Sequence, residues 1–249
     1  MTRRDEPMDG DSPKNLGNLQ SNTNRVKRHQ GVPDNVKLWS LMNTHLPPIR
    51  RAGIFKLALL GAAVATFCDL IHVQTGTLSY ASPNVFAQAW WCFPGFAVAF
   101  FCMIIVVRGL DHFLPIKVER SCSTTPGSSQ NFVESMLLFF FIYVLSGFAG
   151  GFPIFLSWVF YLAWCLRLVF TPDRAFMAIL GLILALGGTV GESLLSAAGF
   201  VTYMRPDFLL VPAWLPGLYL HGAFALRDGY RLYVATAADK PRMVYKQAP

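Results

Sequence analysis

The chain has 249 residues, of which 53% are hydrophobic and only 14% are charged. A soluble domain usually carries ~25% charged residues, so this composition argues against a soluble globular protein. The formal net charge is +7, with 21 Lys and Arg against 14 Asp and Glu. Most of the bases flank apolar segments, which explains the excess better than nucleic-acid binding does. We therefore expect no nucleic-acid partner.

Six apolar segments follow a polar tail, residues 1–46, which has no sustained helical period and is predicted to be a disordered cytosolic tail. A helix needs ~20 mostly apolar residues to cross a bilayer. The predicted fold is an all-α polytopic membrane protein, a compact bundle of six transmembrane helices within residues 47–231, followed by a cytosolic tail, 232–249. The spans are placed at Ala52–Val73, Val85–Val107, Phe132–Gly150, Phe152–Val169, Ala175–Ala198 and Leu209–Leu226.

The connections between these spans alternate in charge. Residues 108–131 hold three bases and the segment after residue 226 holds five, whereas residues 73–84 hold no charge. Lys and Arg near span ends stay in the cytosol. Both termini are therefore predicted to be cytosolic, in the endoplasmic reticulum membrane of a eukaryote or the plasma membrane of a bacterium.

Ionisable side chains inside a span are costly and need a partner or a path to water. Asp69 and His72 share one face of the first span, and Glu192 shares a face of the fifth with Thr189 and Ser196. The carboxylates and the histidine are predicted to meet in one polar cluster that binds a lipid head group or a small polar ligand. The alternative is that they reach the water at the membrane surface.

Other features inside the spans are interpreted as structural. Pro94 and Pro216 are expected to interrupt the second and sixth spans. Gly187 and Gly191 form a small-residue motif that predicts close packing of helices within the chain, and His221 is expected to bond a neighbouring helix. We find no metal-binding or catalytic motif and no convincing internal repeat, so we expect no enzyme, metal or cofactor other than a bound lipid.

Two longer motifs resemble the Insig (insulin-induced gene) family and its bacterial relatives. The first is Ala89-Trp90-Trp91 with Pro94, and the second is Tyr203 with Pro206-Asp207-Phe208 and Trp214-Leu215-Pro216. Asp173-Arg174 is also similar to a loop of that family. The resemblance covers about Ala52–Arg231 and agrees with six spans.

The resemblance implies a lipid-binding regulator that acts by binding partner membrane proteins. Animal members bind oxysterols, retain a sterol-sensing escort protein and help degradation of a reductase, and bacterial relatives look like trimeric diacylglycerol binders. It implies partner contacts at Asp173 and Arg174. The implied lipid site, for a sterol or diacylglycerol, combines the polar cluster with the motif residues: Asp69, His72, Trp91, Pro94, Thr189, Glu192, Ser196 and Tyr203.

This chain departs from the family pattern at three positions. Asp69 and His72 stand where animal members have uncharged Asn and Gln, and Glu192 stands where a neutral side chain is usual. These groups favour a ligand with a more polar head, such as diacylglycerol. Two alternatives remain open: a small transporter or intramembrane enzyme that uses Asp69, His72 and Glu192, and an oligomeric scaffold without a ligand.

Overall fold

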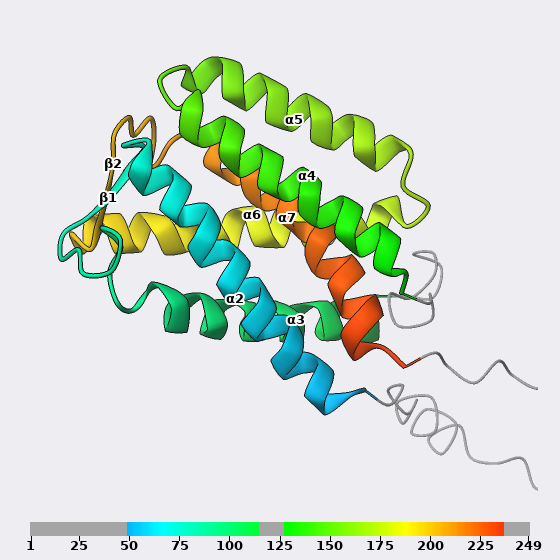
Figure 1. Ribbon diagram of the computed structural model, residues 1–249. Coiled ribbons are helices and arrows are strands. Elements are labelled where there is room, and N and C mark those ends of the chain that lie inside the picture. Colours follow the sequence, from blue (N-terminus) through cyan, green and yellow to red (C-terminus); the bar gives the residue numbers. More distant parts are fainter. Residues whose placement is uncertain (1–48, 115–126, 237–249) are drawn as a thin grey trace, which may run out of the picture. The chain divides into compact units, whose positions relative to one another are not determined.

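The computed structural model describes residues 49–114 and 127–236, all of which belong to one unit of the chain, Leu46–Pro249. The predicted tail, residues 1–46, and most of the predicted C-terminal tail lie outside these ranges. Within them the chain forms six α-helices and two short strands (Figure 1). In chain order these are α2 (Arg51–Gln74), β1 (Leu78–Tyr80), α3 (Cys92–Phe113), α4 (Ser129–Phe148), α5 (Pro153–Val169), α6 (Arg174–Ala197), β2 (Val201–Tyr203) and α7 (Leu215–Gly229), which continues as a π-helix, η2 (Tyr230–Val234).

The predicted all-α bundle of six helices is confirmed. Among the described residues, α2, α3, α4 and α6 are long and apolar enough to cross a bilayer, and α5 is a shorter apolar helix of 17 residues. Helix α7 has 15 residues and η2 adds 5, so the two together span ~30 Å at 1.5 Å per residue, about the thickness of the hydrocarbon core.

The second and sixth spans start at the wrong residues, and α3 also ends at Phe113 and not at Val107. Helix α3 begins at Cys92 and not at Val85, and α7 begins at Leu215 and not at Leu209. Pro94 and Pro216 therefore lie in the first turn of a helix and do not interrupt one. A proline fits there because the first-turn N–H groups have no partner inside the helix.

The segments β1–α3 and β2–α7 repeat one another, contrary to the sequence expectation. Helices α2 and α6 both end at a glycine in the left-handed region, Gly76 and Gly199, with φ of 72° and 76°. At both ends the last carbonyls accept the bonds of a Schellman motif, Thr77 N–H to His72 O at 2.8 Å and Phe200 N–H to Leu195 O at 2.9 Å. The strands then pair antiparallel, with Ser79 opposite Thr202.

The loops that follow the strands also match. Val85 pairs with Gln88 and Phe208 pairs with Val211, so each loop contains a two-residue reverse turn. The residues inside these turns have positive φ: Phe86 and Ala87 in one, and Leu209 and Leu210 in the other. Positive φ costs non-glycine residues ~1–2 kcal/mol each, so a shared turn of this kind is not expected by chance. Equivalent residues of the two segments lie 123 positions apart, from the glycines to Trp91 and Trp214.

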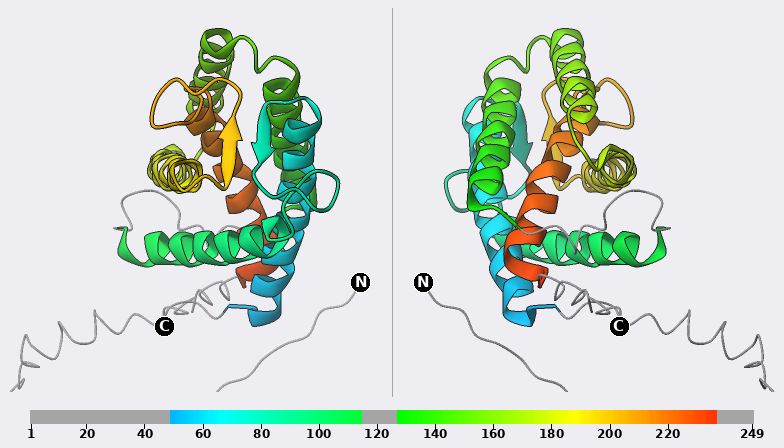
Figure 2. Two further views of the ribbon diagram at one scale, coloured as in Figure 1. Left: turned by 90° about the vertical axis from the view of Figure 1, so that its left-hand side faces the viewer. Right: turned by 90° about the vertical axis from the view of Figure 1, so that its right-hand side faces the viewer.

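Helix α7 lies at the centre of the bundle, where it packs on α4, α5 and α6. Most of its residues are buried, whereas α3 and α5 bury few and lie on opposite sides of the bundle (Figure 1, Figure 2). Two buried apolar clusters form the core, one beside the strand pair around Trp214 and Leu218, and one at the other end around Phe224 and Tyr230. The predicted helix–helix bond of His221 is confirmed, since its Nε2 lies 3.0 Å from Phe160 O on α5.

Candidate functional site

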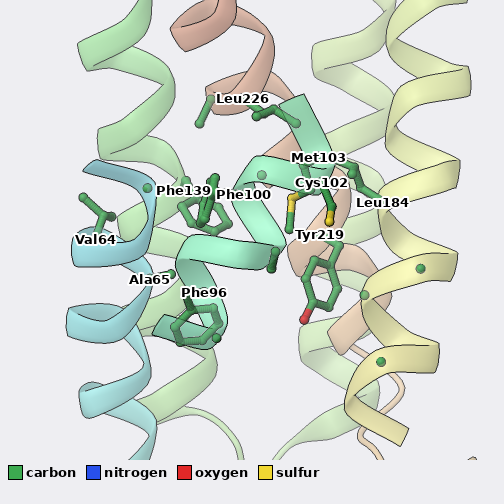
Figure 3. A pocket seen from close by; sticks show the side chains of 18 of the residues that line it. Val64, Ala65, Phe96, Phe100, Cys102, Met103, Phe139, Leu184, Tyr219 and Leu226 are labelled. Carbon is green, nitrogen blue, oxygen red and sulfur yellow. The ribbon is translucent and has the colours of Figure 1, made fainter. Parts of the chain in front are cut away.

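A cavity of about 620 Å³ lies between α2, α3, α4, α6 and α7 (Figure 3). Small-molecule sites commonly measure ~300–1,000 Å³. Its wall is almost entirely apolar, with Leu57, Phe100, Met103, Phe139 and Leu184 among the lining side chains. A wall of this kind suits a hydrocarbon group and offers little to a soluble polar ligand.

The polar groups of the cavity gather at the end beside the strand pair. Glu192 is the only charged residue among the described residues that line it. Its Oε2 accepts a bond from the Tyr203 hydroxyl at 3.1 Å, and its Oε1 accepts one from the Tyr219 hydroxyl at 3.2 Å. Figure 3 shows Tyr219 with its hydroxyl directed away from the end that Leu226 lines. The cavity thus has one polar end.

The equivalent pair in the first segment is closed off. Asp69 lies 123 positions before Glu192, and Tyr80 lies 123 positions before Tyr203. The Tyr80 hydroxyl donates to Asp69 Oδ2, which also accepts from Gln88 Nε2 at 3.2 Å. Asp69 is only 6% exposed, and it does not line the cavity. Two carboxylate–tyrosine pairs therefore hold equivalent places, but the first contributes only Tyr80 to the cavity wall, whereas the second contributes its carboxylate.

Both strand tyrosines remain protonated donors. Burial, and secondly the charge of Asp69, raise the pKa of Tyr80 far above its usual value near 10. Burial and then the charge of Glu192 do the same to the pKa of Tyr203. Each phenol therefore keeps its proton at physiological pH and serves only as a partner that holds its carboxylate in place.

His72 is part of the structure that closes the first segment. Its Nε2 lies 2.8 Å from Ser146 Oγ, and Ser146 donates its own proton to the backbone oxygen of Tyr143 at 2.9 Å. The histidine also packs against the rings of Tyr143 and Trp214, with centroids 4.8 Å and 5.5 Å away. His72 and Ser146 are 3% and 0% exposed, and neither lines the cavity.

Of the remaining predicted lipid-site residues, some line the cavity and others lie outside its wall. Trp91 lines the cavity and packs edge-on against Tyr80, whereas Pro94 does not line it. Thr189 is buried with no partner for its hydroxyl among the described residues, and Ser196 Oγ bonds Leu210 O at 3.2 Å. Tyr203 stands behind the wall and contacts Glu192 from there. Whether these residues bind lipid stays a prediction.

The glycines of α6 correct one expectation. A Cβ added at Gly187 or Gly191 would meet nothing within 4 Å, so these two residues leave space in the cavity and do not pack helices together. Gly188 does pack, because a Cβ there would lie 2.4 Å from the Tyr219 ring. The equivalent residues of α2 are Val64, Ala65 and Cys68.

The position of Asp173 at a span end suggests that water solvates it, but the structure buries this side chain. It is 4% exposed and pairs with Arg227 Nη1 and Arg231 Nη2, each at 2.7 Å. Arg227 also pairs with Asp228 at 2.9 Å. This network ties the start of α6 to the end of α7, so the carboxylate has a structural role. Arg174, the other predicted partner residue, is exposed.

The described residues contain no group of His, Cys, Asp and Glu side chains that could hold a metal ion. The sequence analysis missed Tyr80, Tyr143 and Tyr219, together with most of the apolar wall. The repeat could have led to Tyr80, which lies 123 positions before the predicted Tyr203, but not to Tyr143 or Tyr219.

Comparison with solved structures agrees with this fold. The crystal structure of a mycobacterial Insig homolog, MvINS from Mycobacterium vanbaalenii, matches with a TM-score of 0.59 and 22% sequence identity, over 77% of this chain and 98% of that one. The crystal structure of a cross-linked MvINS trimer matches with a TM-score of 0.57, over 73% of this chain and 94% of that one. No protein-family profile and no curated protein matches the sequence. The resemblance to Insig proteins is thus confirmed for the fold.

Proposed function

We propose that this multi-pass membrane protein with an Insig-like fold binds a lipid in the cavity and acts as a regulator by binding partner membrane proteins. The observation that carries the proposal is the apolar cavity of about 620 Å³ with Glu192 at one end. An amphipathic lipid has the same division, with a long apolar part and a small polar head. The fold shared with an Insig homolog supports the same conclusion.

The polar end supports a ligand with a hydrogen-bonding head over a purely apolar one. A sterol with a hydroxyl group and diacylglycerol are the two candidates. Each Glu192 oxygen accepts only one tyrosine bond, and a hydrocarbon would leave its remaining acceptor capacity unused, at ~1–3 kcal/mol for each unsatisfied group. Glu192 therefore favours the more polar head of diacylglycerol.

We further propose a homotrimer with both termini in the cytosol, as the alternating charge of the connections and the trimeric MvINS structure support. Exposed Arg174 is available to a partner protein. Asp173 would have to exchange its bonds to Arg227 and Arg231 for bonds to that partner. The membrane is the endoplasmic reticulum in a eukaryote and the plasma membrane in a bacterium.

Lipid extraction and mass spectrometry of the purified protein test the proposal. The variant Gly191→Phe places a ring in the open part of the cavity, and Leu186→Phe places the same ring on the exposed side of α6 as a control. We expect about one lipid per chain in the wild type and in Leu186→Phe, and a loss of most of it in Gly191→Phe. Equal lipid in all three, or none in any, would contradict the proposal.

The internal repeat is the observation that favours a transporter, since many transporters are built from related halves. However, two of the three ionisable residues expected to serve transport or catalysis, Asp69 and His72, lie outside the cavity. Ser146 donates its proton to a backbone oxygen and not to His72, so this pair is not arranged as a nucleophile and its base. Only Glu192 remains in place for such chemistry.

A further inference from the structure

Glu192 sits among acids and phenols that come from every element around the polar end. Tyr203 of β2 and Tyr219 of α7 donate to it. Asp69 of α2, Tyr143 of α4 and Cys92 of α3 lie within reach of its charge. Each of these groups is neutral when protonated and negative when deprotonated, so none of them can carry a positive charge.

No Arg, Lys or His occurs among the described residues that line the cavity. A carboxylate in an apolar site without a counter-charge costs several kcal/mol, and a second carboxylate nearby adds to the cost. An ionised Glu192 therefore needs a positive charge that the described residues around the cavity do not supply. The ligand is the remaining source of that charge.

Tyr143 supplies a second, independent observation. It lines the cavity and is only 7% exposed. Within the part of the chain that the structure describes, its hydroxyl group makes no hydrogen bond, although its backbone oxygen accepts one from Ser146. A nearly buried hydroxyl without a partner is an unused acceptor and donor at the polar end of the cavity.

We propose that the cavity selects lipids with a primary amine head, whose ammonium group binds between the Glu192 carboxylate and the Tyr143 hydroxyl. The inference rests on the proposed lipid site and names an amine as its preferred head, in place of the hydroxyl head of diacylglycerol or a sterol. An ammonium has three N–H donors and one positive charge, so it bonds both oxygen groups and neutralises the acid. A hydroxyl head has one donor and leaves the carboxylate without a counter-charge. Bonds between charged partners are about twice as strong as neutral ones.

The ionic contact gives binding a pH dependence with a definite sign. An alkyl ammonium keeps its proton up to about pH 10, like a lysine side chain. The preference for the amine therefore falls as the pH is lowered far enough to protonate Glu192, because the neutral acid cannot offset the ammonium charge. An alcohol of the same chain length is uncharged and should show little dependence.

The experiment titrates delipidated full-length protein in detergent with dodecylamine or 1-dodecanol and follows the tryptophan fluorescence, to which Trp91 in the cavity wall contributes. Detergent micelles without protein correct for partition. We expect the wild type to bind the amine at least about tenfold more tightly than the alcohol, a difference of ~1.4 kcal/mol. Glu192→Gln should lose this preference but still bind the alcohol. Asp69→Asn, the equivalent change outside the cavity, should keep it.

The outcomes separate the inference from the proposed function. Equal affinity for amine and alcohol in the wild type, or a preference that survives Glu192→Gln, overturns the amine head but leaves the lipid site intact. Binding of neither compound to the wild type overturns both. Tyr143→Phe gives an independent reading, since it keeps the ring and removes the acceptor, and it should weaken amine binding without changing that of the alcohol.

Discussion

The segment from α2 to α3 and the segment from α6 to α7 repeat one backbone: a helix that ends at a glycine, a short strand, a strained turn and a second helix. Their side chains have diverged at the carboxylate. Asp69 is satisfied by Tyr80 and Gln88 and is shut away from the cavity, whereas Glu192 bonds two tyrosines and faces it. The same backbone thus places the carboxylate outside the cavity in one segment and in the cavity wall in the other.

The helix residues near the carboxylates explain why only one of them lines the cavity. Gly187 and Gly191 leave space where α2 carries Val64 and Cys68. Gln88 of the first segment reaches Asp69, but its equivalent, Val211, has no polar group to offer Glu192. The carboxylate that lines the cavity is therefore the one beside smaller helix residues and with one hydrogen-bond donor fewer.

The largest expected effect concerns the start of the two segments. Asp173 opens α6 within a buried ion network, and the equivalent Arg50, which opens α2, is exposed. We expect Asp173→Ala to lower the free energy of unfolding by about 3 kcal/mol, because breaking a buried ion pair typically costs ~3–5 kcal/mol and Arg227 retains Asp228. Thermal unfolding in detergent measures this.

Arg50→Ala and Arg174→Ala serve as matched controls, because both remove an exposed charge and should change stability by less than ~1 kcal/mol. A contrary outcome would be that Asp173→Ala is as stable as the wild type and only fails to co-isolate with a partner protein. In that case the carboxylate would be a binding residue, and the difference between the two helix starts would not affect stability.

A smaller effect separates two neighbouring glycines of α6. A Cβ at Gly188 would lie 2.4 Å from the Tyr219 ring, while a Cβ at Gly187 meets nothing within 4 Å. Overpacking typically costs ~1–3 kcal/mol, so Gly188→Ala should destabilise the protein by that amount. Gly187→Ala should stabilise it slightly, because alanine favours a helix by ~1 kcal/mol over glycine. Chemical denaturation of the two variants, side by side, decides the point; equal stability would mean that Tyr219 moves freely.

Hydropathy predicted four of the six helices to within a few residues, because lipid-facing helices such as α2 and α6 are long and apolar. It failed at the starts of α3 and α7, since Val85–Trp91 and Leu209–Trp214 are apolar loops and hydropathy does not distinguish an apolar loop from a helix. The repeat was missed although part of it can be read from the sequence, because Gly76, Tyr80 and Trp91 recur 123 positions later as Gly199, Tyr203 and Trp214. The shared turn could not be read there, since residues such as Phe86 and Leu209 give no sign of a positive φ.

The candidate site was predicted less completely than the fold. Intramembrane charge pointed to Asp69 and Glu192, but no local pattern shows which of the two faces open space, because that depends on α3, α4 and α7. The ion network of Asp173 was not predicted for a similar reason: its partners Arg227 and Arg231 lie 54 and 58 residues further along the chain. Contacts between residues so far apart in the chain are set by the packing of the helices and not by local sequence.

The smallest effect on stability comes from making the two segments alike. The double variant Gly187→Val with Gly191→Cys places on α6 the residues that α2 carries at the equivalent positions. Both side chains enter open space, and both residues form helix slightly better than glycine, so the free energy of unfolding should change by less than ~1 kcal/mol.

The cavity should nevertheless shrink beside Glu192. We therefore expect mass spectrometry to find less bound lipid than in the wild type, while the reverse change on α2, Val64→Gly with Cys68→Gly, should lower stability. Undiminished lipid in the α6 variant would show that the missing side chains do not create the site, and that the difference between the segments lies in α3 and α4 instead.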